Sequence, residues 1–376
     1  MHPEDRFACA RVEPSVGRLI CVFAALLALG SRGSLALDLA AEKAERAKQN
    51  ASCAGCHPDI AAEWATSLHQ GAWRDKVFQE AYKIEPLPFC RGCHAPESDP
   101  QKEPTAKAQE IGVSCVSCHL EVDGVHGTKA APTAEHELVV DAKLATPAFC
   151  ARCHQFDFPA DAKQHHPQPM QDTIAEHAAS SRADTPCQSC HMPVVDGPEG
   201  KHKSHKFNVL ADEAMIRRAV TVQAERSDTS SGPRVRITLT AAEVGHAFPT
   251  GDMFRRVEVR AIAVDPSGKT IATAPPALLQ RRFDDVPRDP TGLDVSFMRV
   301  EVEDSRVPAP GLGARTVTFA LPSTAARARI VYSVVYQRMS TPMASAFGVE
   351  QVLDEIIVNK GELLPRLLAH TAGGPR

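Results

Sequence analysis

Hydrophobic and polar residues follow different patterns in the two halves of the chain. From about residue 215 onwards, β-branched residues alternate with polar ones in short segments, which is typical of strands with one buried face. This pattern indicates about seven strands, the number expected of a β-sandwich. The clearest predicted strands are Val235–Leu239, Val257–Arg260, Phe297–Val302, Thr316–Phe319 and Ile330–Tyr336, and Asp265–Gly268 is a predicted turn.

The stretch between residues 50 and 212 does not alternate in this way. It is rich in proline, alanine, histidine and charged residues, and it is poor in long apolar runs. Such a segment cannot bury enough apolar surface to form an ordinary core. Short helices are predicted at Asp59–His69 and Met170–Ser180, and a helix near Val349–Leu368 is predicted to follow the strands.

The first forty residues have the features of a targeting segment. Three arginines precede an apolar run over Leu19–Leu29, and Ser34-Leu35-Ala36 places small residues where a signal peptidase cuts. An uncleaved anchor is the alternative, but the run is shorter than the ~20 apolar residues that span a bilayer. Residues 1–36 are therefore predicted to be a signal peptide, and the processed chain is expected to have no stable membrane span.

The length of 376 residues favours two domains. The expected fold class is α+β by domains. An irregular and helical domain over residues 37–212 is followed by an all-β, sandwich-like domain over residues 213–345, and residues 346–376 form a C-terminal helix and tail. The formal net charge of −4 argues against a nucleic-acid partner, because that role requires a basic surface.

The cysteines follow a regular pattern. Two of the twelve lie in the predicted signal peptide, and the other ten form five Cys-x-x-Cys pairs, each followed directly by histidine. No cysteine of the processed chain is left over for a disulfide. The five motifs are Cys53/Cys56/His57, Cys90/Cys93/His94, Cys115/Cys118/His119, Cys150/Cys153/His154 and Cys187/Cys190/His191.

A Cys-x-x-Cys-His sequence is typical of covalent haem attachment. The two thiols add to the vinyl groups of haem as thioethers, and the histidine that follows ligates the iron. Redox dithiols usually stand on a thioredoxin-like βαβ pattern, and zinc knuckles do not require a histidine after each pair. The sequence therefore predicts five covalent haems c. Their porphyrins would supply the apolar mass that residues 50–212 lack.

A six-coordinate iron needs a second axial ligand. Ten further histidines of the processed chain are available, which is enough for five bis-histidine haems, while Met170 and Met215 are weaker candidates. His165 and His166 are adjacent, so at most one of them, for example His166, ligates a given iron.

His246 is a further candidate, although it lies beyond the haem motifs. Gly245, Pro249 and Gly251 surround it and could hold the imidazole in one direction, so that it reaches a haem in the other domain. An ordinary turn between strands, with a surface histidine, explains the loop equally well.

Three segments carry patterns beyond the motifs themselves. They are Trp64-x-x-Ser67-x-His69 after the first motif, Gly112-Val-Ser before the third with His126 beyond it, and Met192-Pro193 after the fifth with Ser204-His205-Lys206-Phe207 beyond it. Residues 50–210 thereby resemble the c-552/c-554 family, which includes the tetrahaem cytochrome that accepts electrons from hydroxylamine oxidoreductase. The resemblance implies closely stacked, bis-histidine haems with His69, His126 and His205 as distal ligands. The tetrahaem protein has four haems rather than five and lacks the β-rich half.

Two functions are compatible with these patterns. The first is electron transfer through six-coordinate haems, between periplasmic redox proteins or quinol-linked membrane cytochromes. The second is oxidation or reduction of a small nitrogen or sulfur oxyanion at one open haem. Related nitrite-reducing enzymes often replace one proximal histidine with lysine, whereas all five motifs here end in histidine. The sequence therefore favours electron transfer, and the periplasm is the expected compartment because haem c is attached outside the cytoplasmic membrane.

Overall fold

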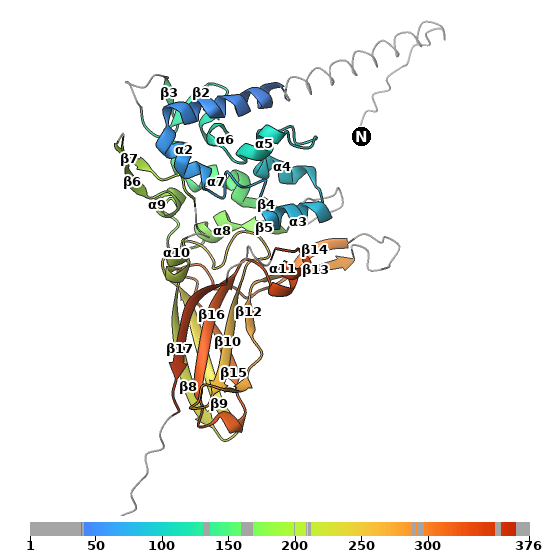
Figure 1. The fold of residues 1–376 in the computed structure, drawn as a ribbon, viewed down its shortest axis with the longest axis vertical. Coiled ribbons are helices and arrows are strands. Elements are labelled where there is room, and N and C mark those ends of the chain that lie inside the picture. The colour runs from blue at the N-terminus through green and yellow to red at the C-terminus, as the bar shows by residue number, and fades with distance from the viewer. Residues whose placement is uncertain are drawn as a thin grey trace, which may run out of the picture.

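Short helices lie at one end of the protein and most strands lie at the other (Figure 1). The computed structural model describes residues 39, 41–130, 136–158, 168–198, 200–207, 209, 212–287, 291, 297–349 and 355–365. Helices and small hairpins come from the first half of the chain, and two larger sheets come from the second. This mixture confirms the predicted α+β class.

The described helices of the first half are short, apart from an initial helix over residues 41–56. Proline occupies the first turn of α2, α4 and α7, where its missing N–H group is tolerated. The bounds are α2 Pro58–Ala65, α3 Lys76–Ile84, α4 Pro88–His94, α5 Ala106–Ile111, α6 Cys115–His119, α7 Pro147–His154, α8 Thr173–Ala178 and α9 Cys187–His191, with a 3₁₀ helix at Ala142–Ala145.

Three small sheets connect these helices. The first contains β1 Leu120–Glu121, β2 Gly124–Gly127 and β3 Leu138–Val140, and the parallel pairing of β2 with β3 brings the chain back beside the third motif. The other two are the hairpins β4 Gln155–Asp157 with β5 Pro169–Asp172, and β6 Val194–Gly197 with β7 Gly200–Lys203.

Two sheets in the second half form a sandwich, entered through α10 Glu213–Arg218. One sheet has the order β15-β9-β8, and the other has the order β11-β10-β16-β17, with β12 also paired to β10. Their inner residues share one core of 24 buried residues, which includes Ile237 of β9 and Val259 of β10. The bounds are β8 Val220–Thr229, β9 Gly232–Ala241, β10 Arg256–Val264, β11 Thr270–Thr273, β12 Ala277–Leu279, β15 Ala314–Ala320, β16 Arg329–Gln337 and β17 Ile356–Leu363, with a 3₁₀ helix at Ser323–Ala325.

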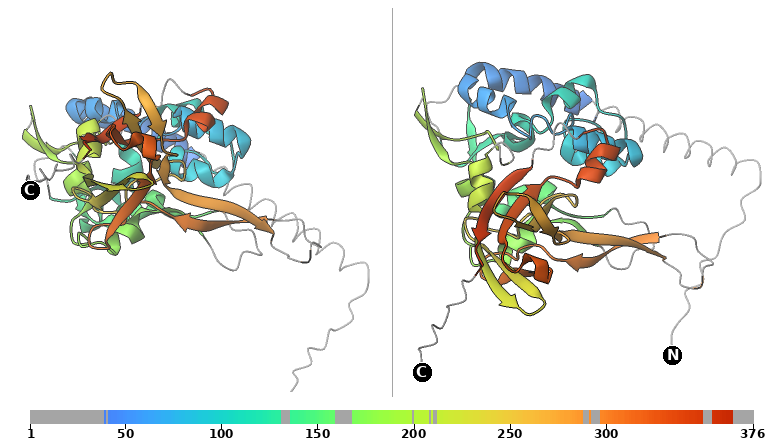
Figure 2. Two further views of the ribbon diagram at one scale, coloured as in Figure 1. Left: turned by 90° about the horizontal axis from the view of Figure 1, so that it is seen from below. Right: turned by 60° about the horizontal axis from the view of Figure 1, so that its bottom comes forward.

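A separate hairpin projects sideways from the junction of the two halves (Figures 1 and 2). It consists of β13 Arg281–Pro287 and β14 Phe297–Asp304. At its base, the buried Arg281 donates to the carbonyl oxygens of Pro169 (2.5 Å) and Met170 (3.0 Å) in β5. The hairpin is thereby attached to the helical half.

The C-terminal helix predicted over Val349–Leu368 is wrong. Residues 356–363 form β17, which pairs antiparallel with β16. Ile356 and Val358 are buried while Ile357 is exposed, so this segment alternates with the period of a strand. The two sandwich sheets therefore contain eight described strands, where the sequence predicted about seven.

The two predicted helices of the first half are shorter than expected. The helix over Asp59–His69 ends at Ala65, and the Thr66 hydroxyl then donates to the Glu63 carbonyl oxygen at 2.9 Å. Within Met170–Ser180, only Thr173–Ala178 is helical, because the residues before it pair with β4. In the first case a side-chain hydrogen bond, and in the second case strand pairing, takes the place of further helical hydrogen bonds.

The two halves are in direct contact. Val77 of α3 packs with Met339 and with Ala344 of α11 Thr341–Ala346 in a small buried cluster. Beside it, Arg338 pairs with Asp75 at 2.6 Å. In the part of the chain that the structure describes, no helix is both long and apolar enough to span a membrane.

Candidate functional site

Each Cys-x-x-Cys-His motif lies at the end of a helix. Its histidine is the last residue of α4, α6, α7 or α9, and His57 directly follows the initial helix. Residues three and four positions apart share a helix face, so the two thiols and the imidazole project to one side. All ten cysteines are free thiols in this structure. The arrangement suits one planar ligand held by two sulfurs and one nitrogen.

Four of the five motif histidines face a histidine from another part of the chain. An iron held ~2 Å from a nitrogen of each imidazole would separate the two ring centres by roughly 6.3 Å. The residues present therefore fit an iron between each pair. The ring centroids are 6.3 Å apart for His57 and His136, 6.2 Å for His154 and His69, 6.3 Å for His119 and His205, and 6.3 Å for His191 and His246.

Burial keeps several of these imidazoles uncharged. It lowers the pKa of His69, His191 and His246 to about 4. At neutral pH each ring therefore keeps the nitrogen lone pair that a metal requires.

Backbone carbonyl groups orient four of the rings through Nδ1. A hydrogen bond at this nitrogen favours the tautomer that leaves Nε2 available to a metal. The acceptors are the carbonyl oxygens of Ala72 for His94 (2.8 Å), His126 for His119 (2.9 Å), Lys203 for His205 (2.7 Å) and Ala247 for His246 (2.9 Å).

Comparison with known proteins agrees with this geometry. Residues 52–120, which contain the first three motifs, match the family model for cytochrome c554 and c-prime. The chain is also similar in structure to a penta-heme cytochrome c552 from Thermochromatium tepidum, with a TM-score of 0.64 and 19% identity over 83% of this chain and 97% of that chain. The chain thus resembles multihaem c-type cytochromes of the c554 family over residues 52–120 and in its fold. No curated protein sequence matches it.

His126 does not face a motif histidine. Its Nε2 lies 2.7 Å from an Asp123 carboxylate oxygen, and its Nδ1 lies 3.3 Å from one of Asp141. Both ring nitrogens are thus engaged by carboxylates, and the role of His126 as a distal ligand stays a prediction. The ring that faces His57 belongs to His136 instead, which the sequence did not single out. The parallel pairing of β2 with β3 brings the chain near His136 back to the motifs. No sequence motif around His136 predicts this position.

The second motif differs from the others. The Phe78 ring stacks on His94, with centroids 3.6 Å apart and ring planes at 7°. Among the residues with described positions, no second histidine ring faces His94 as in the other four pairs. The candidate ligand His166 lies outside the described residues.

The five motifs adjoin one another in a branched row. Thiols of neighbouring motifs lie close enough to shift each other's pKa, which places the first motif beside the third, the second beside the fourth, and the fourth beside the fifth. Between the third and fourth motifs, Arg152 donates to the Ser117 carbonyl oxygen at 3.4 Å. The row therefore runs from the first motif through the third to the fourth, which adjoins both the second and the fifth. The thiol pairs are Cys53/Cys115, Cys93/Cys153 and Cys150/Cys187.

Two ends of this row reach the surface. Cys56 of the first motif and Cys190 of the fifth are exposed, whereas the other eight motif cysteines are only partly exposed. The protein therefore has two accessible motifs, separated by the third and fourth.

Proposed function

We propose that this cytochrome binds five haems and passes electrons along them between redox partners. The facing histidine pairs, with centroids 6.2 to 6.3 Å apart, carry this proposal. An iron with a nitrogen ligand on each side has no open position for a substrate, and electron transfer is the function that such an iron retains.

The proposed attachment residues are the ten motif cysteines and, as proximal ligands, the five motif histidines. The proposed distal ligands are His136 for the first motif, His205 for the third, His69 for the fourth and His246 for the fifth. The family resemblance implied His126 as a distal ligand without assigning it to a motif, and His136 is proposed here for the first motif. Histidine on both sides, rather than methionine on one, favours low reduction potentials.

The contacts between motifs support a route for the electrons. Haem attaches at the motif sulfurs, so neighbouring thiols indicate neighbouring haems. An electron that enters at the exposed first motif would pass the third and fourth haems and leave at the exposed fifth. The haem of the second motif would be a side branch from the fourth.

The proposed compartment is the periplasm, and the proposed partners are redox proteins or quinol-linked membrane cytochromes. The arginines and apolar run before residue 30 support export. The formal net charge of −4 gives no reason to expect a nucleic-acid partner.

The number and state of the haems test this proposal. Under denaturing conditions, the mass of the purified cytochrome should equal residues 37–376 plus five haems. Electron paramagnetic resonance of the oxidised protein should show at least four low-spin irons, because four motif histidines face a second imidazole. A mass with three or fewer haems, or mostly high-spin iron, would contradict the proposal.

A second candidate function rests on His94, which faces no other imidazole among the described residues. If its haem is open on the distal side, the cytochrome is an oxidoreductase for a small nitrogen or sulfur oxyanion. An open ferrous haem should bind carbon monoxide.

On this second function, the reduced protein should bind one carbon monoxide per chain and reduce nitrite, hydroxylamine or sulfite at enzyme-like rates. Replacing Cys90 and Cys93 with alanine should abolish both, whereas the same change at Cys187 and Cys190 should leave the binding intact. Binding without turnover would leave electron transfer as the function. Absence of both would eliminate the oxidoreductase.

A further inference from the structure

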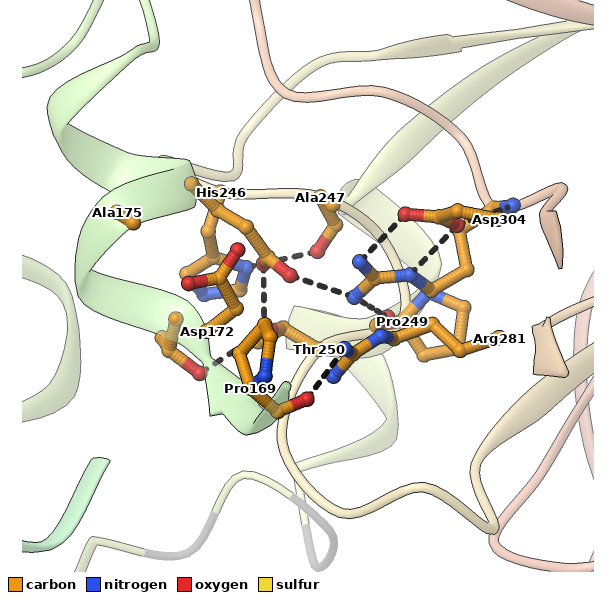
Figure 3. Close-up of polar contacts among 12 residues, drawn as sticks. Pro169, Asp172, Ala175, His246, Ala247, Pro249, Thr250, Arg281 and Asp304 are labelled. Atoms are coloured by element: carbon orange, nitrogen blue, oxygen red, sulfur yellow. Dashed lines mark hydrogen bonds and ion pairs between the residues drawn. The ribbon is translucent and has the colours of Figure 1, made fainter. Parts of the chain in front are cut away.

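The loop that carries His246 is fixed to the β-sandwich half. Phe248 and Val307 exchange two backbone hydrogen bonds, of 2.9 and 3.0 Å, and both side chains are buried. The chain two residues beyond the imidazole is therefore attached to the segment that follows β14. Figure 3 shows this loop beside α8.

Arg306 is the centre of a polar network behind this loop. Its side chain is only 6% exposed, and it pairs with Glu176 of α8 at 2.7 Å and with Asp304 of β14 at 2.7 Å. It also donates to the Pro249 carbonyl oxygen at 3.1 Å. Burial alone would lower the pKa of Arg306, but the Asp304 and Glu176 carboxylates raise it above its ordinary value, so the guanidinium stays charged.

Thr250 connects the same loop to α8 a second time. Its hydroxyl donates to Glu176 Oε2 at 2.7 Å and lies 2.9 Å from the hydroxyl of Thr173. Because the Thr250 proton is directed to the carboxylate, Thr173 is the donor of the second bond. The Glu176 carboxylate, which is 8% exposed, is therefore bound both by Thr250 of the loop and by Arg306.

Helix α8 is also tied to the fifth motif. His177 of α8 is buried, and its Nε2 lies 3.0 Å from the Thr185 carbonyl oxygen, two residues before Cys187. Gly245, next to His246, packs against the same ring, where an added Cβ would come within 3.0 Å of Cδ2. One helix thus contacts both the chain before the proximal histidine and the chain around the facing one.

We propose that Arg306 and Glu176 are positioning residues, which hold His246 at the distance from His191 that an iron requires. This inference rests on the proposed role of His246 as a distal ligand. Three contacts fix one arrangement of the loop on α8: the ion pair between Arg306 and Glu176, the bond from Arg306 to the Pro249 carbonyl oxygen, and the bond from Thr250 to Glu176. Apolar packing would fix this arrangement less strictly. The β-sandwich half would then control how firmly one haem is closed.

The alternative is that the buried pair only stabilises the contact between the two halves. The two roles predict different haem spectra. A general loss of stability lowers the unfolding temperature and leaves the native spectrum unchanged, whereas a loosened His246 opens one iron in the folded protein.

The test uses the haem-loaded cytochrome with Arg306→Met, Arg306→Lys and His246→Ala. In Arg306→Met the loop loses its charged donor. We expect the affinity of one haem for carbon monoxide to be about tenfold or more above its wild-type value. Arg306→Lys should be intermediate, because one ammonium can pair with Glu176 but cannot reproduce the whole fork. His246→Ala should open the same haem fully.

Arg226→Met is the matched control. Arg226 lies in β8, its side chain is 3% exposed, and it pairs with Asp228 at 2.8 Å within the β-sandwich half. We expect this variant to be less stable with an unchanged haem spectrum. If Arg306→Met behaves like Arg226→Met while His246→Ala opens one haem, the positioning role is overturned and the ligand assignment stands. If His246→Ala opens no haem, the ligand assignment fails and the positioning role fails with it.

Discussion

Without haem, the described residues between 41 and 207 should lose their order while the β-sandwich remains folded. The sandwich has a core of 24 buried residues, and full burial of each Val, Leu or Ile side chain contributes about 1.5–3 kcal/mol. The main apolar cluster of the helical half has four buried members, Trp73, Tyr82, Ala95 and Ala108. Ordering each backbone residue costs roughly 1–2 kcal/mol, so this cluster cannot hold a segment of that length.

The measurement is hydrogen exchange of a chain in which all ten motif cysteines are replaced by alanine, compared with the haem-loaded protein. Amides of residues 41–207 should exchange nearly as fast as in an unfolded chain. Amides of β9, β10 and β16 should keep most of their protection. Equal protection of both halves in the haem-free chain would show that haem is not needed as core material.

The strands of the second half were predictable because their burial follows the sequence closely. In β9 and β10 every second residue is buried, so the alternation alone locates both strands. The same reasoning would have located β17, where Ile356 and Val358 are buried on either side of an exposed residue. The predicted helix over Val349–Leu368 missed this short alternation. The helices of the first half were harder to predict. Most of them pack against loops and the haem motifs, so they lack the apolar face that a periodic pattern reveals.

The motif cysteines and histidines were identifiable because five residues contain the whole attachment chemistry. A distal ligand has no such local constraint, since it can come from any part of the chain that folds back. His69, His205 and His246 were predicted, and each faces a motif histidine. His126 and His136 lie ten positions apart, and their contacts differ because Asp123 and Asp141 engage the first ring while the second faces His57.

Replacing His136 with alanine should therefore open one haem, whereas replacing His126 should open none. The His136 ring centroid lies 6.3 Å from that of His57, so His136→Ala removes the second nitrogen from the iron of the first motif. One low-spin iron should become high-spin or bind carbon monoxide, while the other four keep their wild-type spectra. The midpoint potential of that haem should also rise, because it loses an imidazole donor.

His126→Ala is the matched control, since His126 lies in β2 and His136 lies two residues before the paired strand β3. The hydrogen bond with Asp123 raises the pKa of His126, which favours the protonated ring and opposes metal binding. This variant should lose only the contacts with Asp123 and Asp141. Its spin states and potentials should match the wild type, as measured by electron paramagnetic resonance and redox titration. If His126→Ala opens a haem and His136→Ala does not, the distal ligand of the first or third haem is the one that the sequence resemblance implied, and the pairing of His57 with His136 is wrong.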